Sequence, residues 1–160
     1  MDAHPVILIA EDNENDIFML RRAFTQLEID SPIFIVSDGE QAISYLHGDG
    51  KYSNRAEYPL PDLLLLDLKM PRTNGFEVLQ WIREQPELFG TRVVVLTSSA
   101  ISADINRAYE AGANSFLTKP SDFQSYVELT EFINGFWLQH NKTLERLPAN
   151  SAAWRQTGTP

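Results

Sequence analysis

The stretch Leu63-Leu64-Leu65-Leu66-Asp67 sets four consecutive leucines directly before an aspartate. A short apolar run without alternation is typical of a strand that is buried on both faces, as in a parallel sheet covered by helices. Four other short apolar runs recur along the chain, and their length and β-branched content favour strands over buried helices. These runs are Val6-Ile7-Leu8-Ile9-Ala10, Ile33-Phe34-Ile35-Val36, Val93-Val94-Val95-Leu96 and Ser115-Phe116-Leu117.

Longer segments with helical spacing separate the runs. The first carries Ile17, Leu20 and Phe24 on one face, and the fifth extends roughly over residues 122–140. Strand and helix therefore alternate five times. This alternation predicts an α/β fold of the flavodoxin-like (βα)5 type, a doubly wound parallel five-stranded sheet with strand order 2-1-3-4-5.

Two stretches depart from this pattern. Residues 47–61 form a polar connection that is long for the loop between a helix and a strand. Residues after 143 mix Pro, Asn, Ser, Gly and Thr, which is typical of a loosely ordered terminus. We therefore expect one domain over residues 1–142 and a C-terminal tail over residues 143–160.

The composition excludes several classes of function. The 160 residues suit one domain, and 13 basic against 22 acidic residues give a net charge of −9. Because phosphate contacts need clustered Lys and Arg, we expect no nucleic-acid partner. The chain has no cysteine, which excludes thiolate metal sites and cysteine nucleophiles. No apolar run approaches the ~18 residues that span a bilayer and no signal peptide is visible, so we expect no membrane partner and a cytoplasmic location.

Acidic residues follow the first and third runs, at the sheet edge where open parallel sheets bind ligands. Glu11 and Asp12 follow the first run and Asp67 follows the third. Because these strands are neighbours in the predicted order, the three carboxylates should converge. At ~4 Å and an effective dielectric of ~20, each pair repels by about 4 kcal/mol, which protonation or a cation must relieve. Hard oxygen ligands, without cysteine or histidine pairs at ligand spacing, predict Mg²⁺ or Mn²⁺ rather than zinc.

Two other polar residues belong to the same edge. Thr97 ends the fourth run and Lys119 follows the fifth. Lys119 could balance a carboxylate or a bound phosphoryl group, and Thr97 could donate a hydrogen bond to a phosphoryl oxygen. Taken singly, these residues have ordinary explanations, such as a helix cap at Asp12 or Asn13, a surface lysine or a strand threonine. Their arrival together at one edge favours a functional site.

The motifs in chain order resemble those of the response-regulator receiver domain of two-component signalling, over about residues 5–141. They are Glu11-Asp12, Asp67-Leu68-Lys69-Met70-Pro71, Asn74-Gly75, Thr97-Ser98 and Lys119-Pro120. The insertion at residues 47–61, with the stretch at residues 61–68, resembles the single-domain branch that is paired with cyanobacterial and bacterial phytochrome kinases.

The resemblance implies a phosphoacceptor and a metal site. Asp67 would take a phosphoryl group from the phosphohistidine of a histidine kinase. Asp12 and Glu11 would hold Mg²⁺ together with Asp67 and the backbone carbonyl of Lys69, and Lys119 would neutralise phosphoryl charge. Such a protein is no enzyme for other substrates, because it catalyses only its own phosphorylation and dephosphorylation.

The resemblance also implies how the phosphate would be sensed. Thr97 would hydrogen-bond a phosphoryl oxygen, and Phe116 would occupy the aromatic switch position that swings inward when Thr97 moves. The peptide bond between Lys119 and Pro120 would be cis. Phe116 is a departure from the tyrosine that is common in the family, since it has no hydroxyl to hydrogen-bond.

Protein contacts or phosphate relay are the expected output, since the tail is too short for a DNA-binding module. We predict that Phe18, Met19, Pro120 and Phe123 form part of the surface that meets the kinase; the alternative is that they fill the margin of the core. Apolar residues of the fifth helix, Phe132, Phe136 and Trp137, predict a homodimer. Their alternative is burial within the chain, beneath the tail with Trp154.

Two rival functions remain open. A metal-dependent hydrolase of the haloacid phosphatase type also uses an aspartate nucleophile, but it needs a second aspartate two places later, where this chain has Lys69. A pseudo-receiver that only binds partners is disfavoured by the intact Asp67, Asp12 and Lys119. The sequence contains no phosphate-binding loop, dinucleotide fingerprint or nucleophile elbow.

Overall fold

The computed structural model describes residues 4–98 and 101–140, and in these ranges five strands alternate with five α-helices. The strands are β1 Ile7–Ala10, β2 Ile33–Val36, β3 Leu63–Leu66, β4 Arg92–Thr97 and β5 Ser115–Thr118. The α-helices are α1 Glu14–Gln26, α2 Gly39–His47, α3 Gly75–Arg83, α4 Ser102–Glu110 and α5 Phe123–Ile133. Shorter segments are the 3-10 helices η1 Gly50–Ser53 and η2 Pro86–Leu88 and the π-helical η3 Asn134–His140.

The five strands form one parallel sheet in the order β2-β1-β3-β4-β5, which confirms the predicted topology. β1 pairs with both β2 and β3, and Ala10 lies level with Leu66. The residues that follow these two strands therefore emerge side by side at one edge of the sheet. The strand order reverses at this point, which is where doubly wound sheets bind their ligands.

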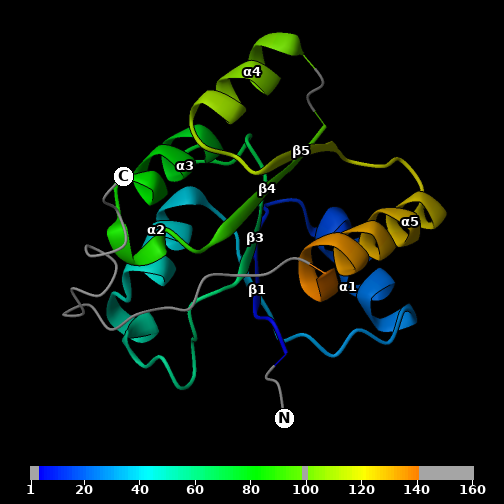
Figure 1. The fold of residues 1–160 in the computed structure, drawn as a ribbon, viewed down its shortest axis with the longest axis horizontal. Coiled ribbons are helices and arrows are strands. Elements are labelled where there is room, and N and C mark those ends of the chain that lie inside the picture. The colour runs from blue at the N-terminus through cyan, green and yellow to red at the C-terminus, as the bar shows by residue number, and fades with distance from the viewer. Residues whose placement is uncertain (1–3, 99–100, 141–160) are drawn as a thin grey trace, which may run out of the picture.

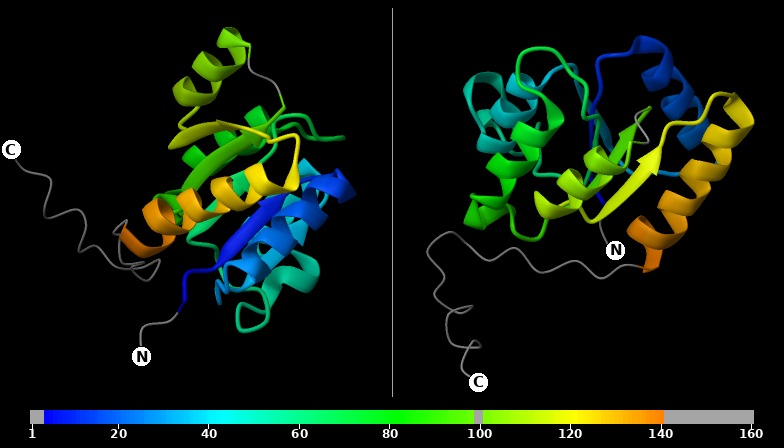
Figure 2. Two further views of the ribbon diagram at one scale, coloured as in Figure 1. Left: turned by 90° about the vertical axis from the view of Figure 1, so that its right-hand side faces the viewer. Right: turned by 90° about the horizontal axis from the view of Figure 1, so that it is seen from above.

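Helices cover both faces of the sheet, which explains the unbroken apolar runs (Figures 1 and 2). α1 and α5 lie together on one face, and α2, α3 and α4 lie on the other. Leu63 and Leu65 point into the core beneath α1 and α5, whereas Leu64 and Leu66 point into the core beneath α2 and α3. Alternate leucines of β3 thus bury into opposite cores, and all four are at most 1% exposed.

Four of the five α-helices have a side-chain cap at their N-terminus, which lies at the ligand-binding edge of the sheet. The oxygens of Asn13, Asp38, Asn74 and Asp122 each accept a hydrogen bond from a backbone N–H in the first turn of the helix that follows. Such caps satisfy N–H groups that have no partner within the helix. Asn13 rather than Asp12 caps α1, so the Asp12 carboxylate is left for other contacts.

The long connection at residues 47–61 is more ordered than its polar composition predicts. The Tyr52 side chain is buried and its ring packs against those of Tyr45, tilted, and Tyr58, edge to face, at centroid distances of 5.0 and 5.1 Å. The Arg55 guanidinium donates to the carbonyls of Tyr45 and Leu46 at 2.7 and 2.8 Å, at the end of α2. Arg55 therefore satisfies helix carbonyls that have no partner within the helix.

The C-terminal helical segment has its predicted extent, but its geometry changes along its length. The α-helix α5 ends at Ile133, and the chain continues in π-helical geometry to His140. The expected boundary at residue 142 and the tail with Trp154 lie outside the described residues. None of the helices in the described ranges combines the length and the apolar character needed to cross a membrane; the cytoplasmic location stays a prediction.

Candidate functional site

Three carboxylates meet at the sheet edge beyond β1 and β3. The backbone N–H of Asp67 donates to the Ala10 carbonyl at 3.0 Å, which holds the two chain segments side by side. Carboxylate oxygens of Glu11, Asp12 and Asp67 all lie within 4.8 Å of one another. Glu11 and Asp67 are buried and Asp12 is exposed, so the cluster has one side open to solvent.

Burial shifts the pKa of the Glu11 carboxyl group. Burial raises its pKa from 4.5 to about 7, although hydrogen bonds from Lys119 and from the Asn13 backbone oppose the rise. One of its oxygens accepts from the Asn13 N–H at 3.0 Å and the other lies 2.6 Å from the Lys119 ammonium. The capping residue of α1 thus also orients Glu11 toward the site.

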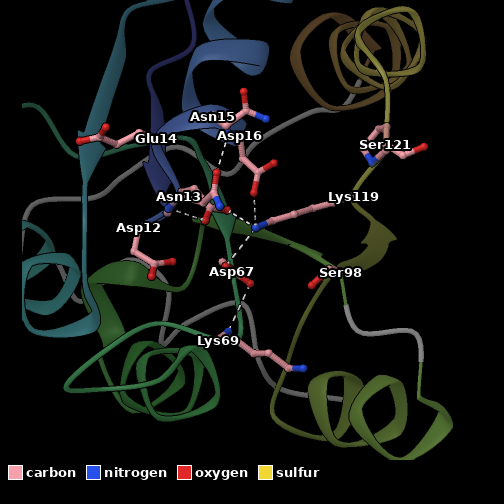
Figure 3. Close-up of a pocket in the computed structure, with 12 residues that line it drawn as sticks. Asp12, Asn13, Glu14, Asn15, Asp16, Asp67, Lys69, Ser98, Lys119 and Ser121 are labelled. Carbon is pink, nitrogen blue, oxygen red and sulfur yellow. Dashed lines mark hydrogen bonds and ion pairs between the residues drawn. The ribbon is translucent and has the colours of Figure 1, made fainter.

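Lys119 neutralises the centre of this acidic cluster (Figure 3). Its Nζ lies 2.6 Å from Glu11, 2.9 Å from Asp16 and 3.1 Å from Asp67. Burial alone would lower the pKa of this amine, but the hydrogen bonds to Glu11 and Asp16 and the nearby negative charges outweigh it and raise the pKa above its usual range. The ammonium therefore stays charged, with each of its three protons directed at a different carboxylate.

Asp16 is a site residue that the sequence reasoning did not identify. It lies in the first turn of α1, where its Oδ2 contacts Lys119 and its Oδ1 accepts a hydrogen bond from the Tyr126 hydroxyl at 2.7 Å. Tyr126 belongs to α5 and is almost fully buried. Its position in the sequence could have identified it. A residue in the first turn of α1, just after β1, lies at the same edge as Glu11 and Asp12.

The backbone around Asp67 is closely packed. A Cβ added to Gly75 would lie 2.3 Å from the Asp67 carbonyl oxygen, so only glycine lets α3 begin this close to the aspartate. The N–H of Lys69 donates to Asp67 Oδ1 at 3.2 Å, while the Lys69 side chain is exposed. The two Asp67 oxygens therefore have separate partners, Lys69 on one and Lys119 on the other.

The predicted sensing residues lie next to this cluster in the sheet. Thr97 ends β4 and is fully buried, and its carbonyl accepts from the Lys119 N–H at 2.9 Å. The following residue, Ser98, lines the same pocket as Asp67 and Lys119 (Figure 3). Phe116 of β5 is half-buried and packs beside Leu68 and Val95.

The four predicted docking residues do not share one environment. Phe18 is 58% exposed, whereas Met19 and Phe123 pack partly against the core beneath α1 and α5. The Arg22 guanidinium lies over the Phe123 ring at 4.3 Å. Pro120 lines the pocket next to Lys119.

The bond between Lys119 and Pro120 is trans, because the described residues contain no cis peptide bond. The cis form that the resemblance implied is thus wrong for this structure. The trans form is the more stable one for an X–Pro bond by about 0.5–1 kcal/mol.

This arrangement fits a small divalent cation and a phosphoryl group. Three hard carboxylate oxygens converge with one open side, which is the ligand type that Mg²⁺ and Mn²⁺ prefer. A fixed ammonium beside Asp67 supplies the positive charge that a transferred phosphoryl group needs.

Comparison with known proteins points to one family. The family model of the response regulator receiver domain matches residues 7–131. The response regulator Rcp1 of Synechocystis sp. is 36% identical over 134 residues, which are 84% of this chain and 89% of Rcp1.

Solved structures agree in fold. The phosphorylated cyanobacterial phytochrome response regulator RcpA has a TM-score of 0.83 and 34% identity, covering 89% of this chain and 100% of that one. The Mn²⁺-bound form of response regulator Rcp1 has a TM-score of 0.80 and 34% identity, covering 88% of this chain and 99% of that one.

Proposed function

This chain belongs to the response regulator receiver domain family, and on that premise we propose that Asp67 accepts a phosphoryl group from a histidine kinase. The observation that carries the proposal is the position of the Asp67 carboxylate, which lies within 4.8 Å of two other carboxylates and 3.1 Å from a buried ammonium. The ammonium offsets part of the negative charge of the nucleophile and of an incoming phosphoryl group, and the neighbouring carboxylates offer ligands to a cation that would offset more of it.

The transfer is a nucleophilic displacement at phosphorus. An Asp67 oxygen forms a bond to phosphorus while the bond to the imidazole nitrogen of the kinase breaks, and the histidine leaves with the electron pair. Lys119 holds its positive charge beside the phosphoryl oxygens. The protein acts on its own side chain, so it turns over no other substrate.

Glu11, Asp12 and Asp67 would hold Mg²⁺, with the Lys69 carbonyl as a further ligand. A bound Mg²⁺, or Mn²⁺ in its place, supplies positive charge that offsets the negative charge of the transferred group. The convergence of the three carboxylates supports this, and a related response regulator is known in a Mn²⁺-bound form.

Thr97 and Phe116 would carry the response to phosphorylation. The Thr97 hydroxyl donates a hydrogen bond to a phosphoryl oxygen, and Phe116 moves inward as Thr97 shifts. The hydrogen bond from the Lys119 N–H to the Thr97 carbonyl supports this by joining the ends of β4 and β5. The surface formed by α4, β5 and α5 would then change its contacts with other proteins.

A phytochrome-type histidine kinase is the proposed donor, because the similar proteins include a phytochrome response regulator. Phe18 is the strongest candidate for kinase contact, since it is a large, exposed apolar side chain of α1, two positions after the site residue Asp16. Met19, Pro120 and Phe123 would form the margin of that surface. A Phe18→Ala variant that accepted phosphate from the kinase at the unaltered rate would contradict this role.

A homodimer through the end of α5 is also proposed. Phe132 and Phe136 are 52% and 51% exposed, and their rings stack at 6.0 Å with an interplanar angle of 7°. A second copy of this chain would cover that apolar pair. Sedimentation that gave a monomer at high micromolar concentration, both with and without phosphorylation, would count against the dimer.

Phosphotransfer tests the main proposal. A histidine kinase and acetyl phosphate, each with a radiolabelled phosphoryl group, should both label the wild-type protein in the presence of Mg²⁺. EDTA or the substitution Asp67→Asn should abolish this labelling. Turnover of small phosphate esters would favour the hydrolase instead. A folded wild-type protein that neither donor labels would favour the pseudo-receiver.

A further inference from the structure

Asp16 is built into the site differently from the other carboxylates. Both of its oxygens have a protein partner: Oδ1 accepts from the Tyr126 hydroxyl at 2.7 Å and Oδ2 lies 2.9 Å from Lys119 Nζ. In the described part of the chain, the carboxylate group that could hold a metal consists of Glu11, Asp12 and Asp67, without Asp16. Asp16 therefore contacts Lys119 but is not a ligand of the proposed cation, whereas Glu11 and Asp67 contact Lys119 and would also bind the cation.

Lys119 needs such a partner because its chain is long. Four methylene groups separate the ammonium from the backbone, and ordering a lysine side chain costs rotamer entropy. The Lys119 backbone is tied to Thr97. A fixed carboxylate at the far end of the side chain is what holds the ammonium at one point.

Tyr126 makes the Asp16 carboxylate rigid. The Tyr126 ring is packed in the core beneath α1 and α5, with 2% of its surface exposed. Burial and the hydrogen bond to Asp16 both raise the pKa of its hydroxyl, so it stays protonated and donates. The hydrogen bond joins residues 110 positions apart, and it connects α5 to α1 at the edge of the site.

We propose that Asp16 is a positioning residue. Held in place by the hydrogen bond from Tyr126, it keeps the Lys119 ammonium beside Asp67 when the carboxylates of Glu11 and Asp67 bind a cation. The inference rests on the proposed phosphorylation of Asp67. The inference has a consequence for Tyr126 of α5. Its hydroxyl donates to Asp16 rather than to Asp67, yet it should affect the rate of phosphorylation.

Two conservative variants test this, Asp16→Asn and Tyr126→Phe, with Glu14→Gln as the control. Glu14 is an exposed acidic residue in the same first turn of α1, and Figure 3 draws it turned away from Lys119. The first readout needs no phosphorylation: the ¹⁵N ammonium resonance of Lys119 in the unphosphorylated protein saturated with Mg²⁺. The second is the rate of phosphorylation by acetyl phosphate at saturating Mg²⁺.

We expect the ammonium resonance to be visible in the wild type and in Glu14→Gln, and to be broadened by proton exchange in both Asp16→Asn and Tyr126→Phe. The maximal rate should fall about tenfold in Asp16→Asn and roughly threefold in Tyr126→Phe, in line with the loss of one hydrogen bond to a group in the site. In Tyr126→Phe the half-saturating Mg²⁺ concentration should change by less than about twofold, because the metal-holding carboxylates keep their charge.

A sharp Lys119 resonance and an unchanged maximal rate in both variants would overturn the inference, whatever happens to their thermal stability. If Asp16→Asn fails to fold, Tyr126→Phe decides alone, because it removes one oxygen from the core. A wild type that is never labelled would contradict the proposed function, while the resonance would still report on Asp16.

Discussion

Replacing Lys119 by methionine should destabilise the metal-free protein and strengthen Mg²⁺ binding at the same time. Methionine keeps much of the aliphatic stem and removes the ammonium that lies 2.6 to 3.1 Å from three carboxylates. Glu11 and Asp67 are then buried without a cationic partner. Protonation of Glu11 or a bound divalent cation then has to relieve their repulsion.

The size of both effects follows from the contacts. At an effective dielectric of ~20, a charge pair about 3 Å apart interacts with roughly 5 kcal/mol, most of which the desolvation of the buried groups offsets. Removing one partner of a buried ion pair costs about 3–5 kcal/mol, so the metal-free variant should lose stability of this order at pH 7.5. Mg²⁺ no longer competes with the ammonium, so its affinity should rise at least about tenfold, or ~1.4 kcal/mol.

Urea unfolding followed by circular dichroism, in EDTA and in saturating Mg²⁺, measures the first effect, and calorimetric titration with Mg²⁺ measures the second. Lys69→Met is the control, because the Lys69 side chain is exposed and its contact with Asp67 is through the backbone. The control should change stability by less than about 1 kcal/mol. A Lys119→Met protein as stable as the wild type in EDTA, with unaltered Mg²⁺ affinity, would refute the reasoning.

Three further predictions follow from single features of the structure. The pKa of Glu11 is raised from 4.5 to about 7 in the folded protein, so the folded state binds the extra proton, and the contribution of this group to stability is complete below pH 4.5 and lost as the pH rises through about 7. This loss should reach at most about 3 kcal/mol in metal-free urea unfolding, and Mg²⁺ should stabilise the protein more at pH 8 than at pH 5.5. Gly75→Ala should cost about 1–3 kcal/mol in urea unfolding and slow phosphorylation, because its Cβ would lie 2.3 Å from a carbonyl oxygen of the site. Arg55→Met should cost about 1.5–3 kcal/mol in urea unfolding, because it removes hydrogen bonds at 2.7 and 2.8 Å to the end of α2, and it should leave phosphorylation unchanged.

Matched variants distinguish these effects from general ones. Glu11→Gln should flatten the pH dependence between about 4.5 and 7, and an unchanged slope would assign it to other groups. Among the described residues, and apart from its chain neighbours and its own helix backbone, the added Cβ of Gly135→Ala has no atom within 4 Å, so equal losses in Gly135→Ala and Gly75→Ala would contradict the packing argument. Arg21→Met changes an exposed arginine of α1 and should alter stability by at most about 0.5 kcal/mol; an Arg55→Met protein no less stable than this control would contradict the capping role.

The sheet was predictable because one physical signal repeats. Strands buried on both faces need continuous apolar runs, and the runs at residues 6–10, 33–36, 63–66, 93–96 and 115–117 each coincide with an observed strand. The strand order then places the residues that follow β1 and β3 side by side. Convergence of Glu11, Asp12 and Asp67 required no further information.

The contacts that sequence reasoning missed depend on side chains far apart in the chain. Asp16 meets Lys119 across 103 positions, and an aspartate in the first turn of a helix is equally well explained as an electrostatic partner of the helix N-terminus. The three tyrosines around residues 45–58 were a visible signal for order in the insertion. The hydrogen bonds from Arg55 to the end of α2 join residues nine and ten positions apart, which no local pattern indicates.

Locating the phosphoryl group tests the central claim most directly. The protein phosphorylated in the presence of Mg²⁺ would be reduced with borohydride, which converts an acyl phosphate to an alcohol, and its peptides sequenced by mass spectrometry. The account predicts that the reduced side chain is residue 67 and that its yield falls to background without Mg²⁺. Reduction of any other carboxylate would contradict it. So would a protein that carries the phosphoryl group but has no reduced carboxylate.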